Sequence, residues 1–313
     1  IKIRKGISAF LDPWIDAVNV VDPRLYSTFR LAGTATGRLS SGGAEGRTGI
    51  NLQQIPRDPR YKRLIQARPG YTLAELDYSQ IELRVAAHLS GDPRMIDIYR
   101  EGGDIHAATA KAVTGKQFLS KSDRTKAKAV NFGFLYGMGA SSFQDYARDS
   151  YGIELSEEEA TEYRKRFFEL YSGLPEWHKR VKEEALRNGY VRTLFGRTRY
   201  LDGIQYWSGP CKGTALRQAV NTSVQSVASD MMILALGMIH RLIVASTEYD
   251  AKIIATVHDS VLLEVKAESA ERVARKAKYI MEHLPLRHFG VKLDVPIKAG
   301  LSIGHRWGEM EEF

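Results

Sequence analysis

The stretch AELDYSQIELR, residues 74–84, joins a predicted strand to a predicted helix. The apolar run 71–76 follows a Pro-Gly pair, which is typical of a buried strand that starts after a turn. From Ile81 onward, apolar residues recur at every fourth position and predict one face of a helix that ends at Gly91–Pro93. Asp77 is therefore expected at the carboxyl end of the strand. It is either a turn or helix-capping residue, or a carboxylate that a rigid scaffold aims.

A second stretch favours the functional role for Asp77. Residues 252–257 and 261–265 are strand-like runs, and only His258–Ser260 lies between them. This spacing predicts a tight hairpin with Asp259 near its tip. Mg²⁺ prefers carboxylate oxygens, and two such ions about 4 Å apart stabilise the attacking and leaving oxygens of a phosphoryl transfer. Two aspartates at strand ends, far apart in the sequence, are the residues that a two-metal site needs.

Three segments resemble the motifs of family A DNA polymerases, the bacterial polymerase I type. Asp77–Arg84 resembles motif A, Arg124–Gly137 resembles motif B, and Val257–Asp259 resembles motif C. The motifs stand in the family's order, and the similarity runs from about Thr34 to the end of the chain. The resemblance implies a template-directed DNA polymerase that adds dNTPs to a primer 3′-hydroxyl by two-metal-ion phosphoryl transfer.

The resemblance also implies the fold. We expect a mixed α/β (α+β) class with a right-hand architecture, in which an antiparallel palm sheet is combined with helical fingers and the thumb is largely absent. The expected segments are a thumb or linker remnant at 1–20, palm at 21–81 and 207–313, and fingers at 82–206. A proofreading exonuclease domain is not expected within this chain.

Site residues follow from the same resemblance. Asp77, Asp259 and the main-chain carbonyl of Tyr78 would bind two Mg²⁺ ions, with Mn²⁺ as a substitute, and Lys128 is a further catalytic residue. The predicted nucleotide-binding residues are Arg124, Lys128, Phe132, Tyr136, His106, Gln80 and Glu82. The predicted DNA-binding residues are Arg38, Asn51, Gln53, Gln54, Arg217, Asn221, Gln225 and His258.

The motif B segment carries an independent signal. A capping-box pattern at Ser120–Asp123 starts a predicted helix, and four residues with cationic and then aromatic side chains follow at i+4 steps, from Arg124 to Tyr136. This order is unusual for a core face, because charged side chains are rarely buried there. It suits a nucleotide, because cations bind the phosphates and aromatic rings bind the sugar and base.

Composition limits the class of protein. The chain has 313 residues, a net charge of +8 and a single cysteine, Cys211, which excludes a disulfide framework and a Cys-rich zinc site. It contains no uninterrupted apolar run of membrane-spanning length and no signal-peptide pattern at its start. We expect a monomer that binds primer–template DNA and dNTPs, without a membrane, in the cytoplasm of a bacterial or phage-infected cell or in an organelle.

Three rival classes are weighed against this interpretation. A two-metal nuclease has no use for the cationic and aromatic residues of motif B. A single-subunit RNA polymerase has a motif C that resembles His258–Ser260, but it carries a small residue at the position of Glu82 to admit ribose. A non-catalytic DNA-binding relic would have lost a metal ligand, whereas Asp77 and Asp259 are both present.

The chain departs from the family pattern at three places. Ser260 stands where motif C usually has a glutamate, and Thr125 stands where motif B often has a second arginine. The segment from Gly42 to Ile50 is longer than the usual family spacing. Neither substitution removes a principal metal ligand, so we expect activity to survive. The family's DNA contacts are not carried over to the longer segment.

Positive charge is concentrated in one part of the chain. From Arg24 to Arg68 there are nine Arg and Lys residues against Glu45 and Asp58, which accounts for +7 of the net +8. The segment has glycine, serine and asparagine between its charges, so it is either a solvated loop or a surface that follows a phosphate backbone.

Salt should therefore weaken primer–template binding steeply. Each cation that contacts a phosphate contributes about 0.9 to the slope of log K against log[salt]. Neutralising basic residues between Arg24 and Arg68 should flatten that slope, measured by fluorescence anisotropy of a labelled duplex at several salt concentrations. An unchanged slope would place the duplex elsewhere on the protein.

Overall fold

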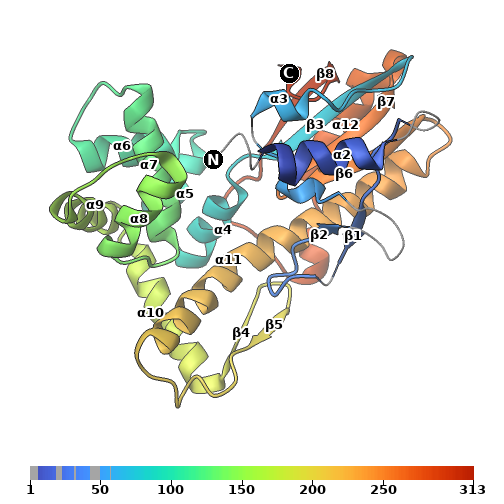
Figure 1. Ribbon diagram of the computed structural model, residues 1–313. Helices are drawn as coiled ribbons and strands as arrows, with labels where there is room; N and C mark the ends of the chain where they lie inside the picture. Colours follow the sequence, from blue (N-terminus) through green and yellow to red (C-terminus); the bar gives the residue numbers. More distant parts are fainter. Residues whose placement is uncertain (1–5, 19–22, 32, 43–49, 57) are drawn as a thin grey trace. The chain divides into compact units, whose positions relative to one another are not determined.

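The structure is a computed structural model, and it describes residues 6–18, 23–31, 33–42, 50–56 and 58–313 (Figure 1). Residues 43–49, within the segment expected to be longer than the family spacing, lie outside the described residues, as do parts of the predicted remnant at 1–20. The chain forms two compact units. The first comprises 1–79, 229–284 and 297–313, and the second comprises 80–228 and 285–296.

The first unit is built on a five-stranded sheet. Its strands are β3 (Tyr71–Tyr78), β6 (Ala251–Val257), β7 (Ser260–Lys266), β8 (Ala299–Arg306) and β9 (Glu309–Glu312). The strand order is β6-β7-β3-β8-β9, and every neighbouring pair is antiparallel. The predicted buried strand, the predicted hairpin and the antiparallel sheet are therefore confirmed.

Each face of this sheet has its own cover. Helix α12 (Ala270–Glu282) packs on β3 and β8, and the hydroxyl of Tyr78 donates a hydrogen bond to the Met281 carbonyl of this helix at 3.0 Å. The opposite face carries a core of Trp14, Leu73, Leu262 and Trp307. Since side chains alternate along a strand, Asp77 lies on the same face as Leu73, opposite α12.

The N-terminal part of the first unit supplies the cover for the second face. Its elements are η1 (Ile7–Leu11), α2 (Asp12–Ala17), β1 (Thr28–Arg30), β2 (Ser40–Gly42), η2 (Leu52–Gln54) and α3 (Pro59–Lys62). Strands β1 and β2 form a small antiparallel ladder. A short turn, η4 (Ala267–Ser269), leads from β7 into α12.

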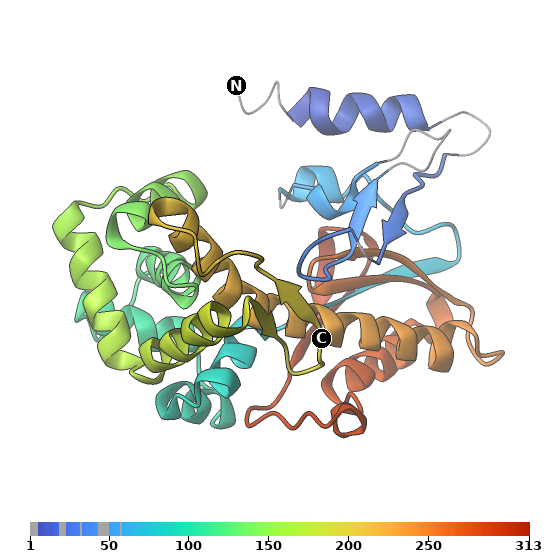
Figure 2. The same ribbon diagram turned by 90° about the horizontal axis from the view of Figure 1, so that it is seen from below.

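The second unit is mostly helical (Figures 1 and 2). Its elements are α4 (Ile81–Ser90), α5 (Pro93–Arg100), α6 (Ile105–Thr114), α7 (Lys121–Leu135), α8 (Ala140–Tyr151), α9 (Glu157–Leu170), α10 (Gly173–Asn188), β4 (Tyr190–Arg192), β5 (Thr198–Tyr200) and η5 (Leu286–Phe289). Aromatic side chains join α7, α8 and α9, because the ring of Phe134 lies 4.3 Å from that of Phe143 and 5.7 Å from that of Phe167. The predicted capping box at Ser120 starts α7. The sequence Ser-Glu-Glu-Glu at 156–159 likewise predicts a helix start, and a capping box at Ser156 begins α9.

Helix α11 (Gly209–Ile239) belongs to both units, up to Ala228 in the second and from Ser229 in the first. The sequence pattern predicts a long helix from about Thr214 to Ala245. The observed helix begins five residues earlier and continues into a π-helical turn, η3 (His240–Val244). The predicted palm segment 207–313 differs from the observed division, because 207–228 and 285–296 group with the helices. The names thumb, palm and fingers stay predictions.

The helix Gly209–Val244 is long and apolar enough to cross a membrane by length and composition, although the sequence shows no uninterrupted apolar run of that length. Within the protein, 44% of its apolar window is buried. Core helices meet the same test, because they too are apolar over many turns. Since Val224 and Met231 are fully buried on this helix, its apolar character is explained by the core.

Candidate active site

The sheet brings the two aspartates of the first unit together. Asp77 at the end of β3 pairs with Ser260 at the start of β7, and the N–H of Tyr78 donates a hydrogen bond to the carbonyl of Asp259 at 3.0 Å. The side chain of Asp77 is exposed, and that of Asp259 is 29% exposed. Two carboxylates that are 182 residues apart in the chain thus stand at one end of adjacent strands, both accessible to solvent.

The turn that carries Asp259 is held by Gln53 of η2. His258 has a left-handed backbone with φ +53°, which is unfavourable by about 1–2 kcal/mol for a residue other than glycine. Its N–H donates to Gln53 Oε1 at 3.1 Å, while Gln53 Nε2 donates to the Thr256 carbonyl at 3.0 Å. Gln53 was predicted only to bind DNA, and the structure shows that its amide also fixes this turn.

A cation lies beside one carboxylate. Arg38 Nη2 is 3.8 Å from Asp259 Oδ1. Burial raises the pKa of the Asp259 carboxyl above its ordinary value, and the Arg38 guanidinium acts against this by lowering the pKa. The remaining predicted DNA-binding residues of this unit lie on the same segment as Gln53: Asn51 accepts a hydrogen bond from Gln53 N–H at 3.1 Å, and Gln54 is exposed.

The donor set fits a hard divalent cation. Within the described ranges, no group of three or more His, Cys, Asp and Glu side chains is placed to hold a metal ion. Asp77, Asp259 and the Tyr78 carbonyl supply oxygen ligands only. Mg²⁺ typically takes one or two protein carboxylates and completes its coordination with water and substrate phosphates. These residues therefore suit Mg²⁺ and do not suit zinc, which takes three or four His, Cys or carboxylate ligands.

Two of the departures from the family pattern have ordinary structural roles. Ser260 is buried, and its hydroxyl donates to the Val257 carbonyl across the turn at 3.1 Å. The Thr125 hydroxyl donates to the Lys121 carbonyl one turn earlier in α7 at 3.0 Å. Neither side chain supplies the charge of the family residue that it replaces.

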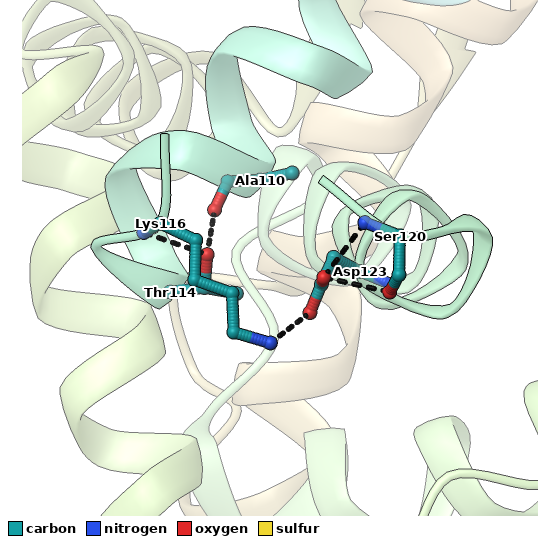
Figure 3. A network of polar contacts seen from close by, with 5 residues as sticks. All are labelled: Ala110, Thr114, Lys116, Ser120 and Asp123. Carbon is teal, nitrogen blue, oxygen red and sulfur yellow. Dashed lines mark hydrogen bonds and ion pairs between the residues drawn. The ribbon is translucent and has the colours of Figure 1, made fainter. Parts of the chain in front are cut away.

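In the second unit, α7 presents the predicted nucleotide-binding side chains on its accessible face. Arg124 is exposed, Lys128 and Phe132 are partly exposed, and Ala127 and Val130 between them are buried. Tyr136 follows the last helical residue as its C-cap. The helix starts at a strong cap, where the Asp123 carboxylate accepts from Ser120 and from Lys116 Nζ at 2.9 Å (Figure 3).

Arg124 and His106 are joined to neighbouring side chains. Arg124 pairs with Asp104 at 2.9 Å, and Asp104 also caps α6 by accepting from His106 N–H. His106 is only 3% exposed, and its Nδ1 lies 2.8 Å from Asn131 Nδ2 on α7. Arg124 is thus available at the surface, whereas His106 packs between α6 and α7 with its ring 6.2 Å from that of Phe132.

Glu82 and Gln80 begin helix α4. Glu82 is buried in the first turn, and the hydroxyl of Tyr136 donates a hydrogen bond to its carboxylate. Gln80 is the N-cap in a left-handed conformation, with φ +56°, and accepts a hydrogen bond from the Tyr99 hydroxyl at 3.0 Å. The guanidinium of Arg84 lies 4.3 Å from the centroid of the Tyr99 ring. Sequence reasoning missed Tyr99, because nothing local to 80–84 reveals a partner on α5.

The predicted DNA-binding residues of α11 lie on its accessible side. Arg217 is exposed, and Asn221 and Gln225 are partly exposed. Asn221 Oδ1 is itself buried, and within the described part of the chain no hydrogen-bond donor meets it. A buried acceptor without a donor is unfavourable.

Comparisons with known proteins show the family and the fold of the chain. The chain matches the sequence model of DNA polymerase family A over residues 1–309. The chain therefore belongs to DNA polymerase family A. The fold is that of a polymerase domain: the POL domain of Pol1 from M. smegmatis, solved as a complex with DNA primer-template and dNTP, aligns with a TM-score of 0.84 at 27% identity over 98% of this chain and 51% of that one.

Two relatives illustrate the similarity in sequence. The thermostable DNA polymerase I of Thermus aquaticus is 39% identical over 99% of this chain and 36% of its own length. The DNA polymerase I of Pseudomonas aeruginosa is 35% identical over 96% of this chain and 32% of its own length. The chain thus spans about a third of the length of these curated relatives.

Two buried histidines of the second unit should make its stability depend on pH. Burial lowers the pKa of His106 and of His178 from 6.5 to about 4. As pH falls from 6.5 to 4, the unfolded chain binds protons that the folded chain excludes, so the free energy of unfolding should fall, by up to about 3 kcal/mol for each histidine.

Urea denaturation followed by circular dichroism between pH 7 and pH 4 measures this fall. His106→Gln should reduce the dependence on pH. The matched control is His288→Gln, an exposed histidine of the same unit, which should leave the profile unchanged. The same dependence of the unfolding free energy on pH in the unmodified chain, His106→Gln and His288→Gln would contradict the assignment of this dependence to His106.

Proposed function

We propose that this chain catalyses template-directed addition of deoxynucleotides to the 3′-hydroxyl of a DNA primer. The observation that carries the proposal is the pairing of β3 with β7, which holds Asp77 and Asp259 at one end of adjacent strands. Membership of DNA polymerase family A and the likeness to a domain solved with primer-template and dNTP support it. In-line attack of the hydroxyl on the α-phosphate of the dNTP would release pyrophosphate.

We assign metal binding to Asp77, Asp259 and the carbonyl of Tyr78, with two Mg²⁺ ions that Mn²⁺ can replace. When bound, such ions lower the pKa of the attacking hydroxyl and neutralise charge on the leaving pyrophosphate. The hydrogen bond from Tyr78 N–H to the Asp259 carbonyl holds the main chain that carries the two aspartates in place. Arg38 beside Asp259 adds a cation that can contact the primer backbone.

Residues of the second unit take the nucleotide in this proposal. Arg124 and Lys128 bind the triphosphate, and Phe132 and Tyr136 contact the sugar and base. Arg124 pairs with the Asp104 carboxylate in this structure. When the nucleotide binds, the guanidinium of Arg124 leaves that carboxylate and pairs with a phosphate of the nucleotide. Buried His106 supports this surface from below by bonding Asn131 of α7.

Duplex binding is assigned to both units. In the first, the basic segment around Arg38 and the exposed Gln54 face the DNA backbone. In the second, Arg217, Asn221 and Gln225 of α11 bind the minor groove, where the exocyclic amine of guanine is the available donor. The protein is proposed to act as a monomer.

Loss of either aspartate should abolish nucleotide addition. Asp77→Ala and Asp259→Ala should each lower kcat at least about 1000-fold, about 4 kcal/mol in the barrier, because each removes a metal ligand. Duplex binding should change little. Primer extension in Mg²⁺ measures this, with Asp149→Ala, an exposed aspartate of α8, as the control. Appreciable extension by either active-site mutant would refute the metal assignment.

Glu82 should exclude ribonucleotides by obstructing the 2′-hydroxyl. A penalty of about 2–3 kcal/mol corresponds to roughly 30- to 150-fold selectivity. Glu82→Gly should raise the rNTP/dNTP ratio of kcat/KM by that factor. Tyr136→Phe, which removes the hydroxyl that donates to the Glu82 carboxylate, should raise it less. Both ratios come from steady-state single-nucleotide addition.

An alternative role for Glu82 is a first-turn acid that favours the helix dipole. It predicts lower stability for Glu82→Gly at an unchanged ratio. An unchanged ratio in a folded, active mutant would remove the sugar gate. The protein would then be better described as an RNA polymerase-like enzyme, since His258–Ser260 resembles motif C of single-subunit RNA polymerases.

A further inference from the structure

The loop between β5 and α11 in the second unit exposes aromatic side chains. On this loop Tyr206 is 91% exposed and Trp207 is 41% exposed, and Tyr200, the last residue of β5, is 69% exposed. In Figure 1 this loop joins the β4–β5 hairpin to the first turn of α11, at the lower edge of the view. Large apolar side chains gathered at a surface mark an interaction site, because leaving them in water is unfavourable.

A groove lies beside these rings. It has a volume of about 710 Å³, and Tyr206, Trp207, Pro210 and Ala215 line it together with the polar ends of Thr214 and Gln218. Flat rings and a few hydrogen-bonding groups side by side suit a planar ligand that is polar at its edges, such as a nucleic-acid base.

The charge around the groove is positive. Residues 190–218 contain five Arg and Lys against one acidic residue, Asp202. Arg199 donates to Gln218 Oε1 at 2.8 Å, and Arg217 donates to Thr214 Oγ1 at 3.0 Å. These partners are neutral groups at the groove, so they hold the guanidinium groups in place without cancelling their charge. Phosphates are the ligands that such cations bind.

We propose that this surface binds single-stranded DNA, with bases stacked on Tyr206 and Trp207 and phosphates bound by Arg199, Lys212 and Arg217. Arg217 is also the first residue of the α11 stripe assigned to the duplex, so the two surfaces are continuous along one helix. The strand is therefore the unpaired template next to the duplex, an identification that rests on the proposed function. The stacking surface itself follows from the exposed rings and the charge.

The tryptophans of the chain provide a direct test. Trp14, Trp177 and Trp307 are 5%, 3% and 1% exposed, so Trp207 is the accessible one of the four. Titration of the 313-residue chain with an oligothymidylate of roughly 16 nucleotides, without dNTPs, should quench the intrinsic fluorescence. Absence of quenching would overturn the proposal.

Substitutions identify the stacking residues. Tyr206→Ala and Trp207→Ala should each weaken binding about tenfold, about 1.4 kcal/mol, measured by anisotropy of the labelled oligonucleotide. Trp207→Phe keeps a ring and should restore most of the affinity while the quenching is lost. The control is Tyr279→Ala, which removes a tyrosine 63% exposed on α12 and should bind as the unmodified chain does. Equal affinity for Tyr206→Ala, Trp207→Ala and the unmodified chain would overturn the proposal.

Other outcomes separate this inference from rival surfaces and from the proposed function. Tighter binding of an oligouridylate would overturn the assignment to DNA. Concentration-dependent self-association that Tyr206→Ala abolishes, without quenching by the oligonucleotide, would assign the surface to a protein contact. If primer extension fails while Tyr206-dependent quenching persists, the stacking surface stands and the polymerase proposal falls. If primer extension proceeds and the oligonucleotide causes no quenching, the proposed stacking surface is overturned and the polymerase proposal stands.

Discussion

The hydrogen bond from Tyr78 N–H to the Asp259 carbonyl sets the register on which the rest of the first unit depends. In a strand, a shift of one residue moves every side chain to the opposite face. Such a slip in β3 would turn Asp77 toward α12 and bring Tyr78 out of the core. The alignment is enforced because such a slip would bury the Asp77 carboxylate and break the hydrogen bond from the buried Tyr78 hydroxyl to the Met281 carbonyl. Packing of Tyr78 against α12 thus keeps Asp77 on the opposite face of the sheet.

In the second unit, polar side chains are held by partners rather than by apolar packing alone. Arg124 is paired with Asp104, and the Glu82 carboxylate accepts from Tyr136. Each pair joins separate helices: Arg124 of α7 contacts the N-cap of α6, and Tyr136 at the end of α7 contacts Glu82 of α4. A charged ligand that takes Arg124 from Asp104 also leaves the N-cap of α6 with one partner fewer. Under the proposed function, binding of a triphosphate to Arg124 would thus be coupled to the stability of α6.

Local patterns predicted much of this architecture from the sequence. The hairpin around Asp259 and the capping boxes at Ser120 and Ser156 are confirmed, because their causes lie within a few residues. Gln53 was interpreted less completely, because its partners Thr256 and His258 lie more than two hundred residues away. The start of α11 lies five residues before the predicted Thr214, because glycine and proline at 209–213 weaken the helical pattern, whereas proline is tolerated in the first turn of a helix. The roles of the site residues stay predictions.

The strand order β6-β7-β3-β8-β9 also constrains how the chain can fold. Strand β3 is central, yet its two partners come much later in the chain: β7 begins at Ser260 and β8 begins at Ala299. The helical residues 80–228 lie between β3 and these partners in the sequence. Non-local pairings form slowly because a long loop must be closed first. During synthesis, the helices can therefore form while β3 still lacks both neighbours. The end of β3 that carries Asp77 is brought beside Asp259 only late in synthesis, when β7 pairs with β3. A nascent chain that ends before β8 still has an unpaired edge on its central strand and is prone to aggregation.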